Sequence, residues 1–165
     1  MSSAIDREAA WLSASGDGLP ALLKSAGGPW DVIQGYWGRT TARMKTGIYL
    51  VRPAVVESRF TNQRKIQTHQ FRGKLWWPIG ATTVQSGLWE DEQRAFDAAV
   101  DLLVDRVRGH ALDHTHGGRF LAVAEAPDGG RITVQFADPE QGQGSSPAAL
   151  RADITYQADD RDFAG

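Results

Sequence analysis

The chain contains no cysteine among its 165 residues. Disulfide bonds and thiolate metal sites are therefore excluded, and no thiol nucleophile is available. No stretch approaches the roughly 20 consecutive apolar residues that a membrane-spanning helix needs. The first eleven residues carry Asp6, Arg7 and Glu8 in place of an apolar segment, so we expect neither a signal peptide nor a membrane partner.

Several catalytic and nucleotide-binding motifs are also missing. The chain has 18 glycines, yet none lies in a Walker-type or Rossmann-type phosphate loop. There is no Gly-x-Ser-x-Gly nucleophile elbow either. The sequence therefore favours a protein that is not an enzyme and needs no cofactor.

Charge is spread unevenly, although the net charge is only −2. Residues 39–74 contain nine basic side chains and one acidic one, whereas residues 75–165 contain seven basic and fifteen acidic ones. Opposite potentials on different faces would favour head-to-tail association of copies, or contact with a polyanion such as DNA. Alternatively, the two blocks fold against each other and neutralise locally.

Helical patterns occur at two main places. Ile5, Ala9 and Leu12 predict a short helix over Ala4–Ser13, and Pro20 can begin a second one over residues 21–24. Between 91 and 108, apolar residues recur every three or four positions, which predicts one long amphipathic helix. Acidic residues 90–92 suit the start of that helix, and Gly109 suits its end.

Alternating or β-rich segments predict strands at 47–52, 66–77, 119–126, 131–137 and 150–156. Pro53 is expected to stop the first strand, and residues 127–130 (Pro-Asp-Gly-Gly) to form a hairpin turn. The last three strands would then form a three-strand antiparallel meander, covered on one face by the long helix. Segments 53–65 and 138–147 are interpreted as long polar loops, the first of which could instead be an extended arm.

These elements indicate the α+β class, with an antiparallel sheet of about four to five strands. We expect a single domain over 1–165, comprising a helical extension at 1–46, a core at 47–157 and an acidic tail at 158–165.

Three of the four histidines lie within seven residues, beside a carboxylate. His110, Asp113, His114 and His116 are a legitimate ligand set for zinc or iron, which would suit a small metal-dependent enzyme. The segment is also a connector between the long helix and a strand. Its polar groups could simply cap the helix and satisfy the backbone, and this interpretation is preferred.

Basic and aromatic residues suggest contact surfaces. An exposed tryptophan in the Trp76-Trp77 pair would need a cover, because neighbours on a strand point to opposite faces. Cations interleaved with amides could approach phosphates without reading sequence, or could keep an edge strand from aggregating. The expected oligomer or partner interface comprises Arg59, Arg64, Lys65, Arg72, Lys74, Trp76 and Trp77.

The order of elements from Gly47 to Tyr156 resembles a known family. The stretches THQFRGKLWWPI (68–79), DHTHGGRF (113–120) and LRADITY (150–156) carry the resemblance. They are similar to tail terminator (tail completion, head-to-tail joining) proteins of long-tailed bacteriophages, especially those of actinobacterial hosts. Head-closure and adaptor proteins of the phage neck are the close alternatives.

The resemblance implies a structural protein of the virion tail or neck, assembled in the host cytoplasm. Such proteins form a ring, typically of six subunits, that caps the tail tube and joins it to the head connector while DNA passes through the hole. The implied partners are further copies of the chain, the tail tube protein and the head-closure protein. No catalytic residues can be transferred.

Overall fold

The computed structural model describes residues 3–15, 18–36, 45–61, 64–79, 89–109, 113–124, 131–137 and 149–162. The side chains at 59–61, 64, 161 and 162 are not described. Two α-helices and one short 3-10 helix accompany six strands in this part of the chain. In chain order they are α1 (Ala4–Ser13), η1 (Lys24–Ala26), β1 (Val32–Gly35), β2 (Gly47–Thr61), β3 (Arg64–Pro78), α3 (Trp89–Arg108), β4 (Ala122–Val123), β5 (Thr133–Phe136) and β6 (Ala149–Asp162).

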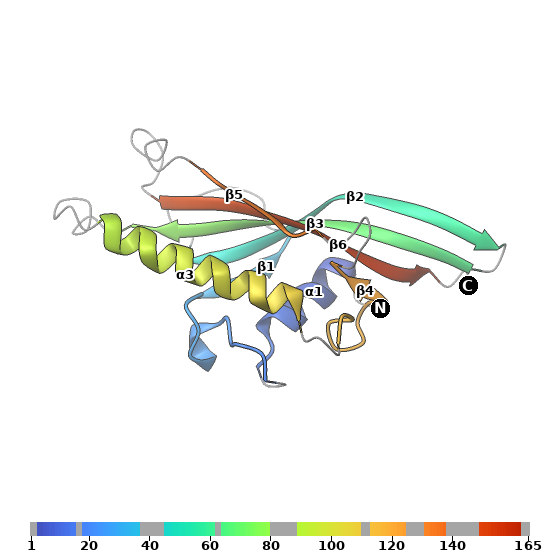
Figure 1. The fold of residues 1–165 in the computed structure, drawn as a ribbon, viewed down its shortest axis with the longest axis horizontal. Helices are drawn as coiled ribbons and strands as arrows, with labels where there is room; N and C mark the ends of the chain where they lie inside the picture. The colour runs from blue at the N-terminus through green and yellow to red at the C-terminus, as the bar shows by residue number, and fades with distance from the viewer. Residues whose placement is uncertain are drawn as a thin grey trace.

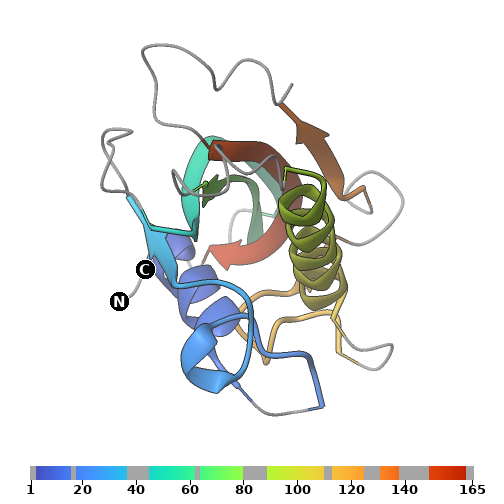
Figure 2. The ribbon, with the colours of Figure 1, turned by 90° about the vertical axis from the view of Figure 1, so that its left-hand side faces the viewer.

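The six strands form one curled sheet in the order β1-β2-β3-β6-β4, and β5 also pairs with β6 (Figures 1 and 2). β3 lies in the middle, antiparallel to β2 on one side and to β6 on the other. β1 runs parallel to β2. The expected α+β class is therefore confirmed, whereas an antiparallel sheet of four to five strands under one helix is only roughly right.

The core lies between one face of the sheet and the two helices. Phe71 and Leu75 of β3 face it and are fully buried. The same cluster contains Ile5 and Leu12 of α1 and Phe96, Val100 and Leu103 of α3. The expected inward set on the last strand is confirmed, since Leu150, Ala152, Ile154 and Tyr156 are all buried. The first residues of the chain thus pack into the same core as the sheet.

Pro53 does not end β2, contrary to expectation. β2 continues to Thr61 and pairs with β3 almost to the turn. The pairing skips from Val51 to Ala54, so one extra residue is accommodated there as a bulge. A proline is tolerated at such an irregularity because its missing N–H breaks no regular ladder bond. Most of segment 53–65 is therefore strand and not a loop, which agrees with the extended-arm alternative.

The predicted meander is also wrong. β4 contains only two residues and pairs with β6 at Ala122↔Asp159, and β5 pairs with β6 at Thr133↔Thr155. The two segments therefore lie one after the other along the same edge of β6. β6 can accept both because it is 14 residues long. The turn expected at 127–130 lies outside the described residues, as does loop 138–147.

Three smaller expectations are corrected. The segment after Pro20 forms no helix at 21–24; the short helix is η1, and Leu23 makes a bridge to Trp30. The acidic tail begins inside β6, where Ala158 is fully buried. The face of the sheet opposite the helices is not bare, because Trp76, Tyr49 and Ala149 form a second buried cluster there.

No helix in the described part of the chain is long and apolar enough to cross a membrane.

The length of β6 gives a first test. A chain ending after Gln157 loses the buried Ala158 and the ion pair between Asp160 and Arg7. We expect the free energy of unfolding, measured in urea, to fall by about 3 kcal/mol, because the packing of Ala158, the last pairs of β6 with β3 and β4, and the partner of a partly buried arginine are lost together. A control chain ending at Asp162 keeps all of β6. Equal stability of the two truncated chains would show that residues 158–162 are a tail.

Candidate functional site

The described members of the histidine cluster do not converge on one point. His114 is exposed, whereas His116 is fully buried. Asp113 accepts hydrogen bonds from the Thr115 hydroxyl (2.6 Å), the Thr115 N–H (2.9 Å) and the Gly117 N–H (3.1 Å). His110 lies outside the described residues. Within the ranges that the structure covers, no group of three or more His, Asp or Glu side chains could hold a metal ion.

Asp113 instead organises the connector after α3. The bonds from the Thr115 side chain and backbone lower the pKa of Asp113, so the carboxylate stays ionised. His116, Gly117 and Gly118 all have positive φ angles of 51°, 69° and 80°. Three such residues in succession turn the chain back towards β4, and a side chain that bonds nearby backbone groups stabilises the turn. This geometry supports the preferred interpretation, in which the polar residues satisfy the connector.

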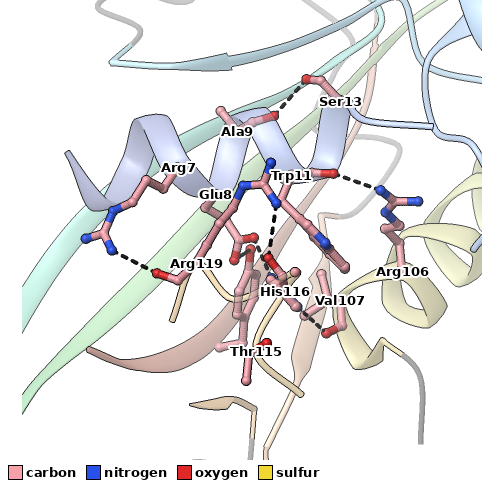
Figure 3. A network of polar contacts seen from close by, with 12 residues as sticks. Arg7, Glu8, Ala9, Trp11, Ser13, Arg106, Val107, Thr115, His116 and Arg119 are labelled. Carbon is pink, nitrogen blue, oxygen red and sulfur yellow. Dashed lines mark hydrogen bonds and ion pairs between the residues drawn. The ribbon is translucent and has the colours of Figure 1, made fainter. Parts of the chain in front are cut away.

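His116 makes a buried contact with Glu8 that joins distant parts of the chain (Figure 3). Its Nδ1 lies 2.6 Å from Glu8 Oε1, and its Nε2 lies 2.8 Å from the Val107 carbonyl. The other Glu8 oxygen accepts a 2.9 Å hydrogen bond from the Tyr156 hydroxyl. Burial, and then the neighbouring Glu8 charge, raise the pKa of Tyr156 well above its usual value, so the phenol remains a donor.

Hydrogen-bond chemistry defines the proton content of this contact. A carbonyl oxygen can only accept, so His116 Nε2 carries a proton. Nδ1 faces a carboxylate, so a further proton lies on Nδ1 or on Glu8. In either arrangement the His116–Glu8 pair has no net charge, which is how two ionisable groups can share a buried position.

Trp11 and Arg106 complete the network (Figure 3). The Trp11 ring stacks on His116 with centroids 3.5 Å apart, and the Arg106 guanidinium lies 4.5 Å from the centroid of the Trp11 ring. Arg106 donates to the carbonyls of Trp11 (2.8 Å) and Ala14 (2.9 Å) at the end of α1. The Trp11 carbonyl also accepts a 3.2 Å bond from the Ala14 N–H, and Arg106 adds a charged donor at this helix end, where a cation is favourable.

A second buried histidine, His69, is held in one tautomer. Arg52 can only donate, so His69 Nδ1 accepts from it at 3.2 Å, and Nε2–H donates to Asp160 at 3.3 Å. Burial lowers the pKa of His69, with the Arg52 and Arg7 charges acting the same way and Asp160 opposing them. Both nitrogens are engaged, so His69 could act as a general base only by losing one of these bonds.

The predicted interface residues have several environments. Trp76 is fully buried and Trp77 half-buried, so the expected exposed tryptophan is absent from this pair. Trp77 packs on Trp30 and Phe96 and donates to Glu92 at 2.8 Å. The side chains of Arg59 and Arg64 are outside the described set. Lys65 pairs in register with Arg59 on one side and Asp162 on the other.

The basic and acidic blocks meet where β3 lies beside β6. Arg72 forms an ion pair with Asp153 (3.1 Å), and the Thr68 hydroxyl donates to Asp159 (2.7 Å). This supports the expectation that the two blocks partly neutralise each other within the fold. The neutralisation is incomplete around Arg72 and Lys74, where a third cation, Arg151, lies on the same face.

These side chains line an open hollow of about 420 Å³. We call it the cationic hollow and define it by Arg72, Lys74, Arg151 and Asp153. Val51 and Phe136 add apolar surface to its lining. Sequence reasoning identified Arg72 and Lys74 but missed Arg151 and Asp153. The alternation in LRADITY places both residues on the polar face of their strand, and that was the available signal.

The exposed end of the sheet is the second surface feature. Residues 52–58 of β2 are all exposed, and with residues 66–70 of β3 they form what we call the ribbon. Figure 1 shows β2, β3 and β6 running on beyond both helices. Val55 and Val56 are 45% and 61% exposed. Because neighbouring residues point to opposite faces, the described residues leave both faces of β2 open at Val55 and Val56, although His69 of β3 is buried.

The two histidines of the connector give a matched pair of variants. His116→Ala leaves Glu8 buried without its partner and should lower the free energy of unfolding by about 3–5 kcal/mol. His114→Ala removes an exposed side chain and should change it by less than about 1 kcal/mol. Urea unfolding measures both. Similar losses of unfolding free energy in the two variants would contradict a structural role for His116. Stoichiometric zinc or iron that only the wild type retains would also contradict it.

The lowered pKa of His69 predicts that the free energy of unfolding depends on pH. This pKa is lower in the folded chain than in the unfolded chain. The stability that neutral His69 provides is therefore complete above about pH 6.5 and is lost as the pH falls towards the folded value. Between about pH 7 and pH 5, the free energy of unfolding should fall more steeply in the wild type than in His69→Gln. Parallel curves for wild type and His69→Gln would refute this.

No protein-family model matches the chain, and no curated protein matches it either. Function has therefore to be inferred from the residues and geometry of this chain.

Proposed function

We propose that this chain is a ring-forming tail terminator of a long-tailed bacteriophage, a structural subunit that caps the tail tube and joins it to the head connector. The three stretches at 68–79, 113–120 and 150–156 carry the resemblance to that family. All three now have structural roles: they form β3, the connector with the Glu8–His116 contact, and the inward face of β6. None of them builds a reaction centre in the described residues.

The single observation that carries the proposal is the exposed ribbon. Val55 and Val56 expose apolar surface on opposite faces of a projecting strand pair, and a covering partner would bury both. Beyond Leu50, no strand in the described part of the chain pairs with the outer edge of β2. Such an edge is a template for a further strand, although Pro53 and the bulge protect its first residues. A partner that covers the ribbon accounts for both features.

The buried histidines support a scaffold role in preference to catalysis. His69 and His116 each use both ring nitrogens in contacts within the fold. A catalytic base needs a free nitrogen aimed at a substrate. The described polar residues are therefore better explained by holding the sheet, α1 and the connector in place for assembly.

The ribbon can be tested directly. The double change Val55→Lys and Val56→Lys puts two cations on the proposed contact surface without touching the core. We expect the variant to fold with an unfolding midpoint close to that of the wild type, because exposed substitutions usually cost less than about 0.5 kcal/mol each. It should no longer bind the ends of purified tail tubes, as seen by electron microscopy and co-sedimentation.

The matched control is Leu121→Lys, which changes an exposed apolar side chain elsewhere on the surface. It should bind tube ends like the wild type. Wild-type chain that never binds tube ends would refute the tail-terminator function, and binding to isolated head connectors alone would favour a head-closure or adaptor role instead.

A further inference from the structure

The cationic hollow lies on the face of the sheet opposite α3. Leu75 points into the core with Phe96 and Leu103 of α3. Arg72 and Lys74 alternate with the core residues of β3, so they point the other way. Arg151 and Asp153 alternate in the same manner with the buried Leu150, Ala152 and Ile154 of β6. The hollow therefore holds three cations and one carboxylate on the face of the sheet opposite α3, which contacts only Phe136 of the lining, through Phe96.

Positive charge is concentrated in this hollow. Burial lowers the pKa of Lys74, and the neighbouring Arg151 charge lowers it further, although Asp153 opposes both. The lysine ammonium and the Arg151 guanidinium also lie over the Trp76 ring, 5.5 Å and 5.9 Å from its centroid. Cations held together in this way would be stabilised by an incoming carboxylate.

The outer face of α3 carries the complementary charge. Arg94 pairs with Glu90 and Asp91 at one end of the helix, and Arg108 pairs with Asp105 at the other. Asp97 and Asp101 lie between them and are exposed. Among the described residues neither of these two has a cationic partner. Like charges four residues apart on a helix destabilise it slightly, so an external cationic partner would relieve the repulsion.

We infer that the acidic face of α3 in one copy docks on the cationic hollow of the next copy. This rests on the proposed function, for which it names the contact between neighbouring subunits. The two surfaces lie on opposite sides of the sheet, so one molecule cannot satisfy itself. Repeating the contact head to tail gives a chain of copies, which closes into a ring when the rotation between neighbouring copies allows it.

Spacing and chemistry fit this contact. Asp97 and Asp101 are one helical turn apart, about 6 Å, and Arg72 and Lys74 are two residues apart on a strand, about 7 Å. A helix about 10 Å wide can lie along an open hollow, whereas duplex DNA would need a broad surface with many more cations. Val51 and Phe136 supply the apolar contact that a mainly ionic interface also requires. The hollow thus fits a second copy of this chain better than nucleic acid.

Variants that reverse the charge of one surface at a time test the contact. One variant carries Asp97→Lys with Asp101→Lys, and the other carries Arg72→Glu with Arg151→Glu. Each alone should sediment as a monomer under conditions where the wild type is oligomeric. An equimolar mixture should recover the wild-type sedimentation coefficient, because the lysine helix then faces the glutamate hollow and the native surfaces face each other. Thermal unfolding checks that both variants are folded.

The control for the helix variant is Asp6→Lys with Asp31→Lys, which makes the same change in net charge at positions outside both surfaces, although it also breaks the ion pair of Asp31 with Lys24. It should sediment like the wild type. An oligomer that survives in both variants, or a mixture that does not reassemble, overturns the inference and leaves the proposed function intact. A wild-type chain that remains monomeric also overturns it, and binding to tail-tube ends then decides the proposed function separately.

Discussion

The rest of the structure depends on the buried carboxylate of Glu8. It contacts His116 in the connector and Tyr156 in β6, so it fixes α1 to two segments more than a hundred residues away. A buried carboxylate is tolerated only where hydrogen-bond partners surround it, so the positions of Glu8 and its partners are closely constrained. Once α1 is in place, Arg7 reaches Asp160, which in turn orients His69, and Arg106 reaches the last carbonyls of the helix.

This constraint separates an inner side of the molecule from an outer one. Towards the helices the sheet is packed, and Glu8, His116 and Tyr156 are hydrogen-bonded there. The cationic hollow lies on the other face, and the ribbon at the far end of the strands exposes one valine on each face. A rigid inner side with uncovered, charged and apolar outer surfaces suits a subunit whose task is to contact copies and neighbours, as a tail terminator does.

The sequence predicted an element correctly where apolar residues recurred at a regular spacing and all faced the core. The three- and four-residue spacing in 91–108 and the alternation in 150–156 predicted α3 and the inward face of β6. Sequence patterns failed where a segment's structure depends on a strand far away in the chain. Pairing with β3 through a bulge keeps Pro53 within a strand. The long β6 pairs with β4 and β5 at separate positions, so those two strands do not pair with each other. The Glu8 contact was invisible for the same reason, since only His116 carried a local signal.

The central claim is that the surfaces left uncovered by one copy are covered by others. Native mass spectrometry of the full-length chain tests it most directly, because the copy number follows from the measured mass. The account predicts one closed assembly of defined copy number, with six as the number implied by the resemblance. A monomer at every accessible concentration, or an open series of masses with no preferred copy number, would contradict it.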